Sequence, residues 1–362
     1  MRYIHLTFAT AVIISILACG TNQTTHQEPD QYSQVYPIAT QGEKQRGGHV
    51  FGRMDTTNIH VMDTYNLDWL TFVPWGSQED YDSQEIIRSR RNRDSTHLKQ
   101  YLESRTDQIR MARERGYKVF YKPHIWMHEP SEGKWRSDIY PTSAENWDLW
   151  KESYRKYILQ WARVAEDGGA EMFCVGTELT RLTLEKSAYW ETLIEEIRAI
   201  YSGKLTYAAN WYEEYENITF WDQLDYIGVQ SYFPLTDHDS PSLDDIKSGW
   251  QPHLERLTAI SQQYNKPILF TELGYKSTID SARRPWEWLD YQDDMGIPIA
   301  EETQADCYRA FFSEVWPQPW FSGVHLWQFR WDFEKGRGKS DWDFTPQGKL
   351  AAEVIKEGFG VE

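Results

Sequence analysis

Two glutamates stand directly after short apolar runs that are typical of buried β-strands. Glu178 follows Phe-Cys-Val-Gly-Thr at residues 173–177, and Glu272 follows Ile-Leu-Phe-Thr at residues 268–271. Two facing carboxyl groups can break a glycosidic bond, because one protonates the leaving oxygen while the other meets the oxocarbenium-like carbon. A separation of about 5–5.5 Å would make the second group a nucleophile and retain the anomeric configuration. The alternative is a pair of structural carboxylates ion-paired with Lys or Arg.

Other apolar runs end in polar and aromatic side chains that could surround the two glutamates. We expect Tyr232 to hydrogen bond to Glu272, because a phenol there would hold and tune the carboxylate. Trp327 is expected beneath the sugar ring, since indole faces suit the C–H faces of sugars. Each side chain could instead pack in the interior, and Lys122 could serve only to balance the carboxylates. The predicted substrate contacts are Lys122, His124, Asn210, Trp211, Tyr232 and Trp327, with Trp75, Trp126 and Trp331 as further candidate sugar platforms.

Eight short β-branched and aromatic runs alternate with stretches of helical periodicity and must position these residues. Apolar residues spaced by three or four between 147 and 165 predict one helix, which ends at Gly168 and Gly169. Segment 212–224 is too short for a full helix. The predicted strands are 48–53, 67–74, 118–123, 172–176, 205–210, 226–230, 267–271 and 323–328.

This alternation is typical of βα units on a parallel sheet, and eight parallel strands close a barrel. A doubly wound open sheet is disfavoured, because no Gly-rich phosphate turn follows the first strand. The predicted fold class is therefore α/β, a single (β/α)8 TIM barrel. In such barrels the reacting groups follow the carboxyl ends of the strands, which is where both glutamates stand.

The first residues resemble an export signal with a lipid attachment site. Arg2 precedes an apolar run over 6–18 that is too short to span a bilayer. Cys19 follows a small residue, as in a bacterial lipobox, and is the predicted lipidation site; an ordinary signal peptide with an incidental Cys19 is the alternative. We expect a signal peptide over 1–18, a flexible tether over 19–44 and the barrel over 45–362. The protein would be exported and lipid-anchored to the bacterial cell envelope, at the outer membrane or cell surface.

Composition limits the partners. The net charge of −17 argues against nucleic acid or another polyanion. The 18 Trp and 22 Tyr exceed what a core of this size needs and favour a sugar ligand, although a large aromatic core is the alternative. A basic cluster is predicted to be a solvated helix face rather than an anion site. It consists of Arg88, Arg90, Arg91 and Arg93.

Cys174 and Cys307 are the other two cysteines, so no disulfide framework is expected. Cys174 lies in an apolar strand run and is predicted to be a small core residue. No metal-ligand spacing is visible, and no cofactor is predicted. The expected partners are a polysaccharide or oligosaccharide substrate and, through the lipid anchor only, the membrane. A monomer is the default expectation.

The strand-end residues resemble the motifs of glycoside hydrolase family 113, a β-mannanase-like family within the large clan of retaining (β/α)8 glycosidases. The most specific matches are Leu-Thr-Tyr-Ala-Ala-Asn-Trp at 205–211 and Cys-Val-Gly-Thr-Glu-Leu at 174–179. The resemblance implies β-1,4-mannan or manno-oligosaccharides as substrate, with Glu178 as acid/base, Glu272 as nucleophile and no cofactor. It places His124, Asn210, Tyr232 and Trp327 around the bond that breaks. The matching stretches are 118–124, 173–179, 205–211, 224–235, 266–275 and 319–328.

Two positions depart from the family pattern. Thr177 stands where most of the clan has Asn before the acid, so the usual contact to the sugar 2-hydroxyl must come from elsewhere. Gln230 stands where the pattern has an acidic residue, which weakens the mannan assignment more than the reaction. The same chemistry on another β-glycan is one alternative. A non-catalytic, surface-tethered glycan-binding barrel is another, and the intact carboxylate pair favours the enzyme.

Overall fold

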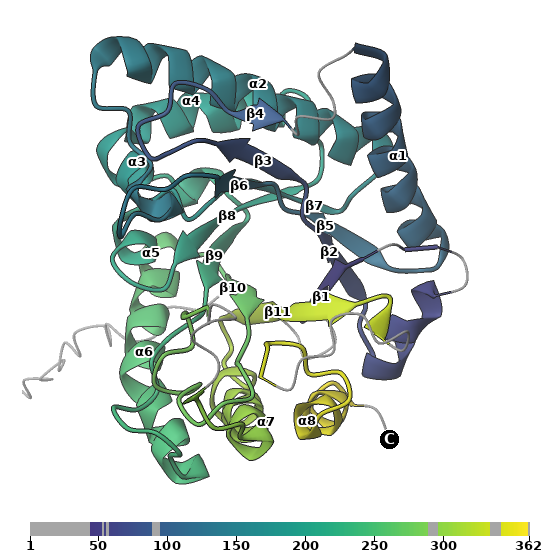
Figure 1. Cartoon of the computed structure of the whole chain (residues 1–362), viewed down its shortest axis with the longest axis vertical. Helices are drawn as coiled ribbons and strands as arrows, with labels where there is room; N and C mark the ends of the chain where they lie inside the picture. Colours follow the sequence, from purple (N-terminus) through teal and green to yellow (C-terminus); the bar gives the residue numbers. More distant parts are fainter. Residues whose placement is uncertain are drawn as a thin grey trace, which may run out of the picture. The chain divides into compact units, whose positions relative to one another are not determined.

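A computed structural model describes residues 44–52, 54–55, 58–88, 95–288, 296–333 and 342–360. Eight parallel strands close into a barrel, in which each strand pairs with its neighbours along the chain and the last pairs with the first. Each predicted strand overlaps one of these eight, which confirms the predicted (β/α)8 barrel (Figure 1). The barrel strands are β1 Gln45–Phe51, β2 Trp69–Phe72, β5 Lys118–Tyr121, β7 Met172–Thr177, β8 Lys204–Asn210, β9 Tyr226–Gln230, β10 Ile268–Leu273 and β11 Phe321–Arg330.

A second, three-stranded sheet was not predicted. After β2 and β5 the chain continues as β3 (Trp75–Gln78) and β6 (His124–Met127), which pair in parallel, and β4 (Ile87–Arg88) pairs antiparallel with β3. These strands are short and partly polar, so they lack the apolar pattern that identified the barrel strands. The small sheet continues from the carboxyl ends of β2 and β5 and adds a wall to that side of the barrel mouth.

Helices surround the barrel (Figure 1). The predicted helix between 147 and 165 is α2, which begins after Ser143, whose hydroxyl accepts from the Asn146 amide. It ends at Gly169, whose φ of 76° lies in the left-handed region that favours glycine. The α-helices are α1 Ser95–Glu114, α2 Ala144–Gly168, α3 Thr180–Glu185, α4 Ser187–Arg198, α5 Glu214–Asn217, α6 Leu243–Tyr264, α7 Glu301–Ala310 and α8 Leu350–Gly358. The 3-10 helices are η1 Ile59–Tyr65, η3 Arg136–Asp138 and η4 Trp221–Gln223, and a π-helix, η6 Phe311–Val315, follows α7.

The connection from β8 to β9 is the thin one, as predicted. It contains only α5, of four residues, and the 3-10 turn η4. The first residue of α5, Glu214, is completely buried. A carboxylate in such a position must be hydrogen-bonded, because an unpaired buried charge is strongly destabilising.

Below its mouth the barrel is filled by side chains. Trp69, Phe120 and Cys174 belong to one buried cluster that also contains Met172, Ala208 and Leu269. The prediction that Cys174 is a core residue is confirmed, and both Cys174 and Cys307 are buried free thiols. Because this layer is closed by packing, ligands can reach the strand-end residues only from the mouth.

Several predictions fall outside the described residues. The signal peptide, Cys19 and tether residues 19–43 lie there, as do Arg90, Arg91 and Arg93. Lys44, the first described residue, is buried and donates to the backbone oxygens of Trp316 and, at 3.1 Å, Gln318. Arg88 lies in β4, not on a helix as predicted, since α1 begins only at residue 95. Within the described ranges no helix combines the length and apolar character that crossing a bilayer requires.

Candidate active site

Glu178 occupies a sharp turn between β7 and α3. Its φ of 53° is left-handed, which a residue other than glycine adopts only when its surroundings hold it there. The Glu178 amide donates to Ala208 O at 2.9 Å, and the next amide, Leu179, donates to the Tyr207 hydroxyl at 2.7 Å. Both acceptors belong to β8, so the neighbouring strand supports the turn. The Glu178 side chain is buried but retains 9% exposure.

Glu272 lies within β10, one residue before its end. The backbone oxygen of Glu272 accepts from Ser231 twice, from its amide at 2.8 Å and from its hydroxyl at 2.6 Å. The β9–β10 pairing shifts register between Phe270 and Glu272. The side chain retains 5% exposure, so it is a buried carboxylate at the carboxyl end of a barrel strand. Glu178 holds the corresponding place after β7.

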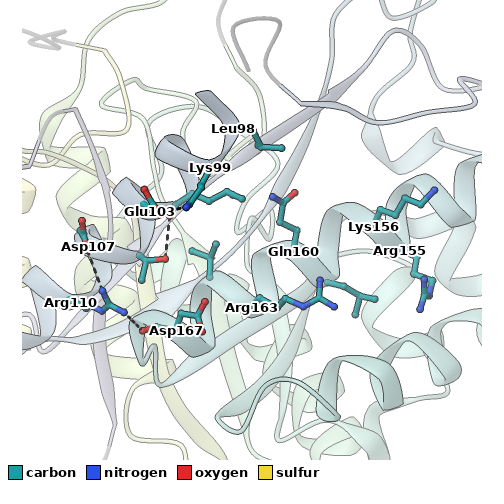
Figure 2. A pocket seen from close by; sticks show the side chains of 14 residues that line it. Leu98, Lys99, Glu103, Asp107, Arg110, Arg155, Lys156, Gln160, Arg163 and Asp167 are labelled. Atoms are coloured by element: carbon teal, nitrogen blue, oxygen red, sulfur yellow. Dashed lines mark hydrogen bonds and ion pairs between the residues drawn. The ribbon is translucent and has the colours of Figure 1, made fainter. Parts of the chain in front are cut away.

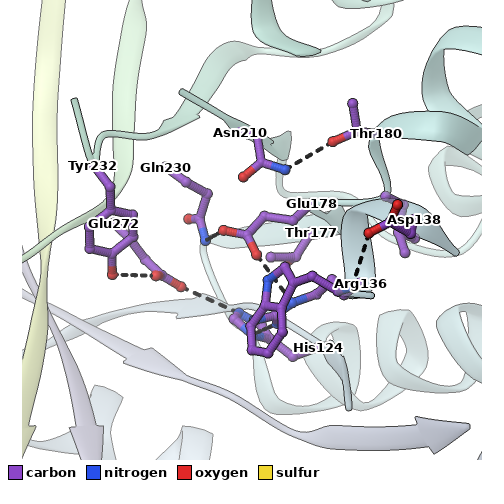
Figure 3. Close-up of polar contacts among 12 residues, drawn as sticks. His124, Arg136, Asp138, Thr177, Glu178, Thr180, Asn210, Gln230, Tyr232 and Glu272 are labelled. Carbon is purple, nitrogen blue, oxygen red and sulfur yellow. Dashed lines mark hydrogen bonds and ion pairs between the residues drawn. The ribbon is translucent and has the colours of Figure 1, made fainter. Parts of the chain in front are cut away.

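The two carboxyl groups belong to one hydrogen-bonded network that runs through Gln230 and Lys122, and Figure 3 shows its Gln230–Glu178 contact. The Gln230 amide donates to Glu178 Oε1 at 3.2 Å. Its oxygen accepts from Lys122 Nζ at 2.8 Å, and the same ammonium lies 2.5 Å from Glu272 Oε1. Closure of the barrel has therefore brought Glu178 and Glu272 to one site. Gln230 was noticed in the sequence only as a departure from a pattern, and this bridging contact was not predicted.

Each carboxylate also has a cationic partner. Lys122 is fully buried beside Glu272, and Arg136 Nε lies 3.1 Å from Glu178 Oε2. Burial lowers the pKa of Lys122, while the negative charge of Glu272 opposes that shift. The ion-paired arrangement weighed as the alternative is thus present, but the pairs lie at the mouth and join each other. Arg136 comes from η3, in the connection between β6 and α2, and was not predicted because no pattern marks that turn.

The neutral His124 offers a hydrogen-bond donor beside Glu272. Burial, reinforced by the charges of Lys122 and Arg136, holds its pKa well below the usual range. Its Nδ1 lies 2.9 Å from Arg136 Nη1 and must accept, because a guanidinium can only donate. The proton therefore resides on Nε2, which lies 3.6 Å from Glu272 Oε1.

His49, on β1, has the opposite tautomer. Its Nδ1 lies 3.3 Å from Leu326 O, which can only accept, so Nδ1 carries the proton. Nε2 is then an acceptor and makes no hydrogen bond within the described residues, although it lies 3.8 Å from Glu272 Oε1. Burial and the nearby Lys122 hold the pKa of His49 well below its usual range. His49 was missed because the first strand carried the weakest sequence signal.

The structure places Tyr232 and Trp327 against the same carboxylate and histidines. The Tyr232 hydroxyl donates to Glu272 Oε2 at 2.8 Å, as expected from the sequence. The Trp327 ring stacks parallel to His124 with centroids 6.4 Å apart and meets His49 edge-on at 5.0 Å. Its indole N–H is buried and has no partner in the described structure. The site therefore has two donors, His124 Nε2 and Trp327 Nε1, and one acceptor, His49 Nε2, that have no hydrogen-bond partner in the described structure.

Asn210 and Thr177 point their polar groups at the protein. The Asn210 amide donates to Thr180 Oγ1 at 2.9 Å, which leaves its carbonyl oxygen as the group that could meet a ligand. The Thr177 hydroxyl donates to Pro123 O at 3.4 Å. Thr177 thus does not replace the amide of the clan pattern. Arg136, beside Glu178, and His124, beside Glu272, are donors that could contact a sugar hydroxyl instead.

An exposed group of indoles, which we call the indole rim, continues outward from the site. It consists of Trp75 and Trp126 on the small sheet and Trp135, which precedes η3. Trp75 packs edge-on against His124 at 4.9 Å and against Trp126 at 6.1 Å, and Trp126 meets Trp135 at 5.8 Å. These side chains retain 37%, 45% and 39% exposure, respectively.

The other predicted platforms differ. Trp331 is buried in the core, so the packing interpretation applies to it. Trp211 is half-buried and stacks on the exposed Trp286 with centroids 5.1 Å apart. Trp288, also exposed, meets Trp327 at 6.4 Å. Trp135, Trp286 and Trp288 were not predicted, because they lie in long loops that carry no periodic signal.

One cavity of the described structure lies away from the strand-end residues. It lies between α1 and α2 on the outside of the barrel and measures about 1010 Å³ (Figure 2). Its charged residues pair locally, as Arg110 does with Asp107 and with the Asp167 backbone oxygen. None of the strand-end residues lines it. Within the described residues no group of three or more His, Cys, Asp or Glu is arranged to hold a metal ion.

Comparison with known proteins identifies the family. The sequence profile of Glycoside Hydrolase Family 113 matches residues 40–349. A GH113 β-1,4-mannanase structure is 27% identical, covers 88% of this chain and all of its own, and superposes with a TM-score of 0.73. The GH113 β-mannanase AaManA from Alicyclobacillus acidocaldarius, in complex with ManMIm, is 25% identical over 87% of this chain and 97% of its own, with a TM-score of 0.71.

A β-glucuronidase from Faecalibacterium prausnitzii shares the fold alone, at 13% identity and a TM-score of 0.54 over 90% of this chain and 49% of its own. No curated protein sequence matches the chain. The resemblance inferred from the strand-end motifs is confirmed by the profile, which spans most of the chain. The protein is therefore a glycoside hydrolase and belongs to Glycoside Hydrolase Family 113.

Proposed function

We propose that this protein hydrolyses β-1,4-mannan or manno-oligosaccharides with retention of configuration, with Glu272 as nucleophile and Glu178 as acid/base. The supporting observation is the shared network in which Gln230 and Lys122 join two strand-end carboxylates that have different surroundings. The similarity to GH113 β-1,4-mannanases supports the choice of substrate.

The proposed reaction is a double displacement. A Glu272 oxygen attacks the anomeric carbon while the proton of Glu178 passes to the leaving oxygen, so one C–O bond forms as another breaks. A water molecule then loses a proton to Glu178 and displaces Glu272 from the sugar. Tyr232 and Lys122 donate to different oxygens of Glu272, which fixes its orientation before attack.

The surrounding charges suit this exchange. When Glu272 becomes an ester it loses its negative charge, and Glu178 acquires one in the same step, so the net charge of the site is unchanged. The new carboxylate of Glu178 lies beside Arg136, which is 3.1 Å away. Neutral His124 and His49 add no further charge. The negative charge thus moves from one position beside a cation to another, so few surrounding charges and dipoles need to reorient during the step.

A longer glycan would extend over the indole rim. Trp75 packs directly against His124, which faces Glu272, so sugar units beyond the reactive one would meet Trp75, Trp126 and Trp135 in turn. Exposed indoles bury apolar area against the C–H faces of sugars while their N–H groups stay available. This arrangement favours a polymer or oligosaccharide over a single sugar as the substrate.

Substrate class and mechanism can be tested together. Purified protein is offered mannan, glucomannan, cellulose and xylan, and release of manno-oligosaccharides is expected. Activity on a glucan alone would refute the mannan assignment. Adding azide to a Glu272→Ala variant should yield the inverted glycosyl azide, whereas a retained product would make Glu178 the nucleophile.

We further propose that the protein is exported and anchored through lipidated Cys19. The apolar run over 6–18 followed by Ala18-Cys19 supports this proposal. A Cys19→Ala variant should leave the membrane fraction while retaining its activity. Membrane retention of that variant would contradict the lipid anchor.

A further inference from the structure

A fully buried carboxylate behind the Glu178 turn takes no part in the reaction described above. Glu214 is the first residue of α5 and has no exposed surface. Among the described residues no cationic side chain forms an ion pair with it. Its oxygens instead accept four hydrogen bonds from neutral donors. These are Tyr207 Oη at 2.6 Å and Thr183 Oγ1 at 2.8 Å on Oε1, and Asn210 N at 2.7 Å and Thr180 Oγ1 at 3.1 Å on Oε2.

The four donors come from the two elements that flank Glu178. Tyr207 and Asn210 lie on β8, whereas Thr180 and Thr183 lie on α3, which begins two residues after Glu178. An ionised carboxylate can accept at about four positions, so it satisfies all these donors at once. Glu214 therefore ties the start of α3 to the end of β8.

Two further hydrogen bonds connect the donors around Glu214 to Leu179 and Asn210, which lie next to the active site. Tyr207 Oη, which donates to Glu214, accepts from the Leu179 amide at 2.7 Å. Thr180 Oγ1, which also donates to Glu214, accepts from the Asn210 side chain at 2.9 Å (Figure 3). Leu179 directly follows Glu178, whose left-handed φ requires support from its surroundings. Both of these hydrogen-bond chains thus end at the Glu214 carboxylate.

We propose that Glu214 is a positioning residue for the acid/base. Its carboxylate holds Leu179 and Asn210, and through them it directs Glu178 at the leaving oxygen without touching the substrate. This inference rests on the proposed role of Glu178. Burial raises the pKa of Glu214 to about 7, and its four hydrogen bonds act in the opposite direction. Burying a carboxylate without a cationic partner is energetically costly, so we infer that Glu214 does more than fill space.

The test compares two leaving groups. Dinitrophenolate departs with little protonation, whereas 4-methylumbelliferone requires the acid, so kcat/KM on the two aryl β-mannobiosides separates a misplaced acid from a general loss. In Glu214→Gln we expect kcat/KM for the methylumbelliferyl substrate to fall about 100-fold, and that for the dinitrophenyl substrate to change by less than about threefold. Tyr207→Phe, which removes the hydroxyl between Leu179 and Glu214, should show the same pattern.

The matched control is Tyr201→Phe. Tyr201 is equally buried and donates to Ala170 O at 2.7 Å, but Ala170 precedes β7 at the opposite end of the barrel. This variant should lose stability without any dependence on the leaving group. Equal losses on both substrates in Glu214→Gln and Tyr207→Phe, or no loss in either, would overturn the inference. If Glu214→Gln does not fold, Tyr207→Phe and Thr183→Val decide by the same ratio.

A Glu178→Gln variant separates this inference from the proposed function. If Glu178→Gln shows the leaving-group dependence and the Glu214 variants do not, only the positioning role fails. If Glu178→Gln shows no such dependence, the assignment of Glu178 as acid/base fails first.

Discussion

Glu272 and Glu178 leave strands of the same barrel at corresponding positions, yet the chain holds them by different means. Glu272 is part of β10, and its partners Lys122 and Tyr232 come from the barrel strand ends themselves. Glu178 lies on a strained turn that β8 supports, and further contacts come from Arg136 in a loop and from Glu214 in the short β8–β9 connection. A nucleophile must be fixed before attack, whereas an acid/base must meet two different oxygens in two steps. Under the roles proposed above, barrel strand ends hold the nucleophile, whereas loop residues add to the support of the acid/base.

The largest expected effect is the loss of activity when either glutamate is replaced. Glu272→Gln should lower kcat by several orders of magnitude on every substrate, because no covalent intermediate can form. Glu178→Gln should cost about 10²–10⁴-fold on a poor leaving group and much less on dinitrophenyl glycosides. Stopped assays with both aryl mannobiosides measure this. Equal losses on the two substrates for Glu178→Gln would mean that the two glutamates do not have distinct roles.

The cations beside the two carboxylates should differ in their importance for folding. Lys122 is completely buried, so Lys122→Met leaves Glu272 as an uncompensated buried charge and should cost about 3–5 kcal/mol of unfolding free energy. Arg136 retains 11% side-chain exposure, and water can replace part of its contact in Arg136→Met. We expect a smaller loss there. Urea unfolding measures the loss of unfolding free energy in both variants. A larger loss for Arg136→Met than for Lys122→Met would contradict the prediction.

Glu214 should make stability depend on pH. Its pKa is raised from 4.5 to about 7, so the folded state binds this proton more tightly than the unfolded chain does. The resulting contribution is complete below pH 4.5 and is lost as the pH rises through 7, with a size of about 3 kcal/mol. We therefore expect the free energy of unfolding of the parent, minus that of Glu214→Gln, to be larger at pH 4.5 than at pH 8. The exposed neighbour Glu213 provides the control, since Glu213→Gln should leave this pH dependence intact. A stability difference independent of pH would refute the prediction.

The smallest expected effect concerns the indole rim. Trp126→Ala should reduce kcat/KM for mannohexaose about tenfold, or about 1.4 kcal/mol, and leave a short aryl mannoside nearly unaffected. Trp126 is 45% exposed, so its loss should scarcely change the melting temperature. Leu149→Ala, which removes a similarly exposed apolar side chain from α2, should change neither value. An equal loss on short and long substrates would place Trp126 outside the glycan path.

Much of this fold was predictable because its signals are local. The apolar runs identified all eight barrel strands, and helical periodicity followed by two glycines located α2 and its end. The small sheet of β3, β4 and β6 was missed, since two-to-four-residue strands with polar members leave no periodic pattern. The Tyr232–Glu272 contact was also predicted, and the two residues lie at the ends of the neighbouring strands β9 and β10.

The partners of the two glutamates were predictable only in part. Lys122 was recognised because it also ends a strand, but its ammonium meets a residue 150 positions away. Arg136 and Glu214 lie in irregular connections, where residue type alone cannot distinguish an active-site contact from a solvated charge. His49 was hidden by a weak first strand.

The amino-acid sequence by itself determined the eight-fold alternation, the family and the two strand-end glutamates, because periodicity and position after a strand are properties of short segments. Tertiary structure alone decided which groups surround those carboxylates. Barrel closure brings Gln230 between Glu178 and Glu272, and loop packing places Arg136 beside Glu178 and Glu214 behind the Glu178 turn. Such contacts join segments far apart along the chain, and their energies depend on burial that exists only once the barrel has formed.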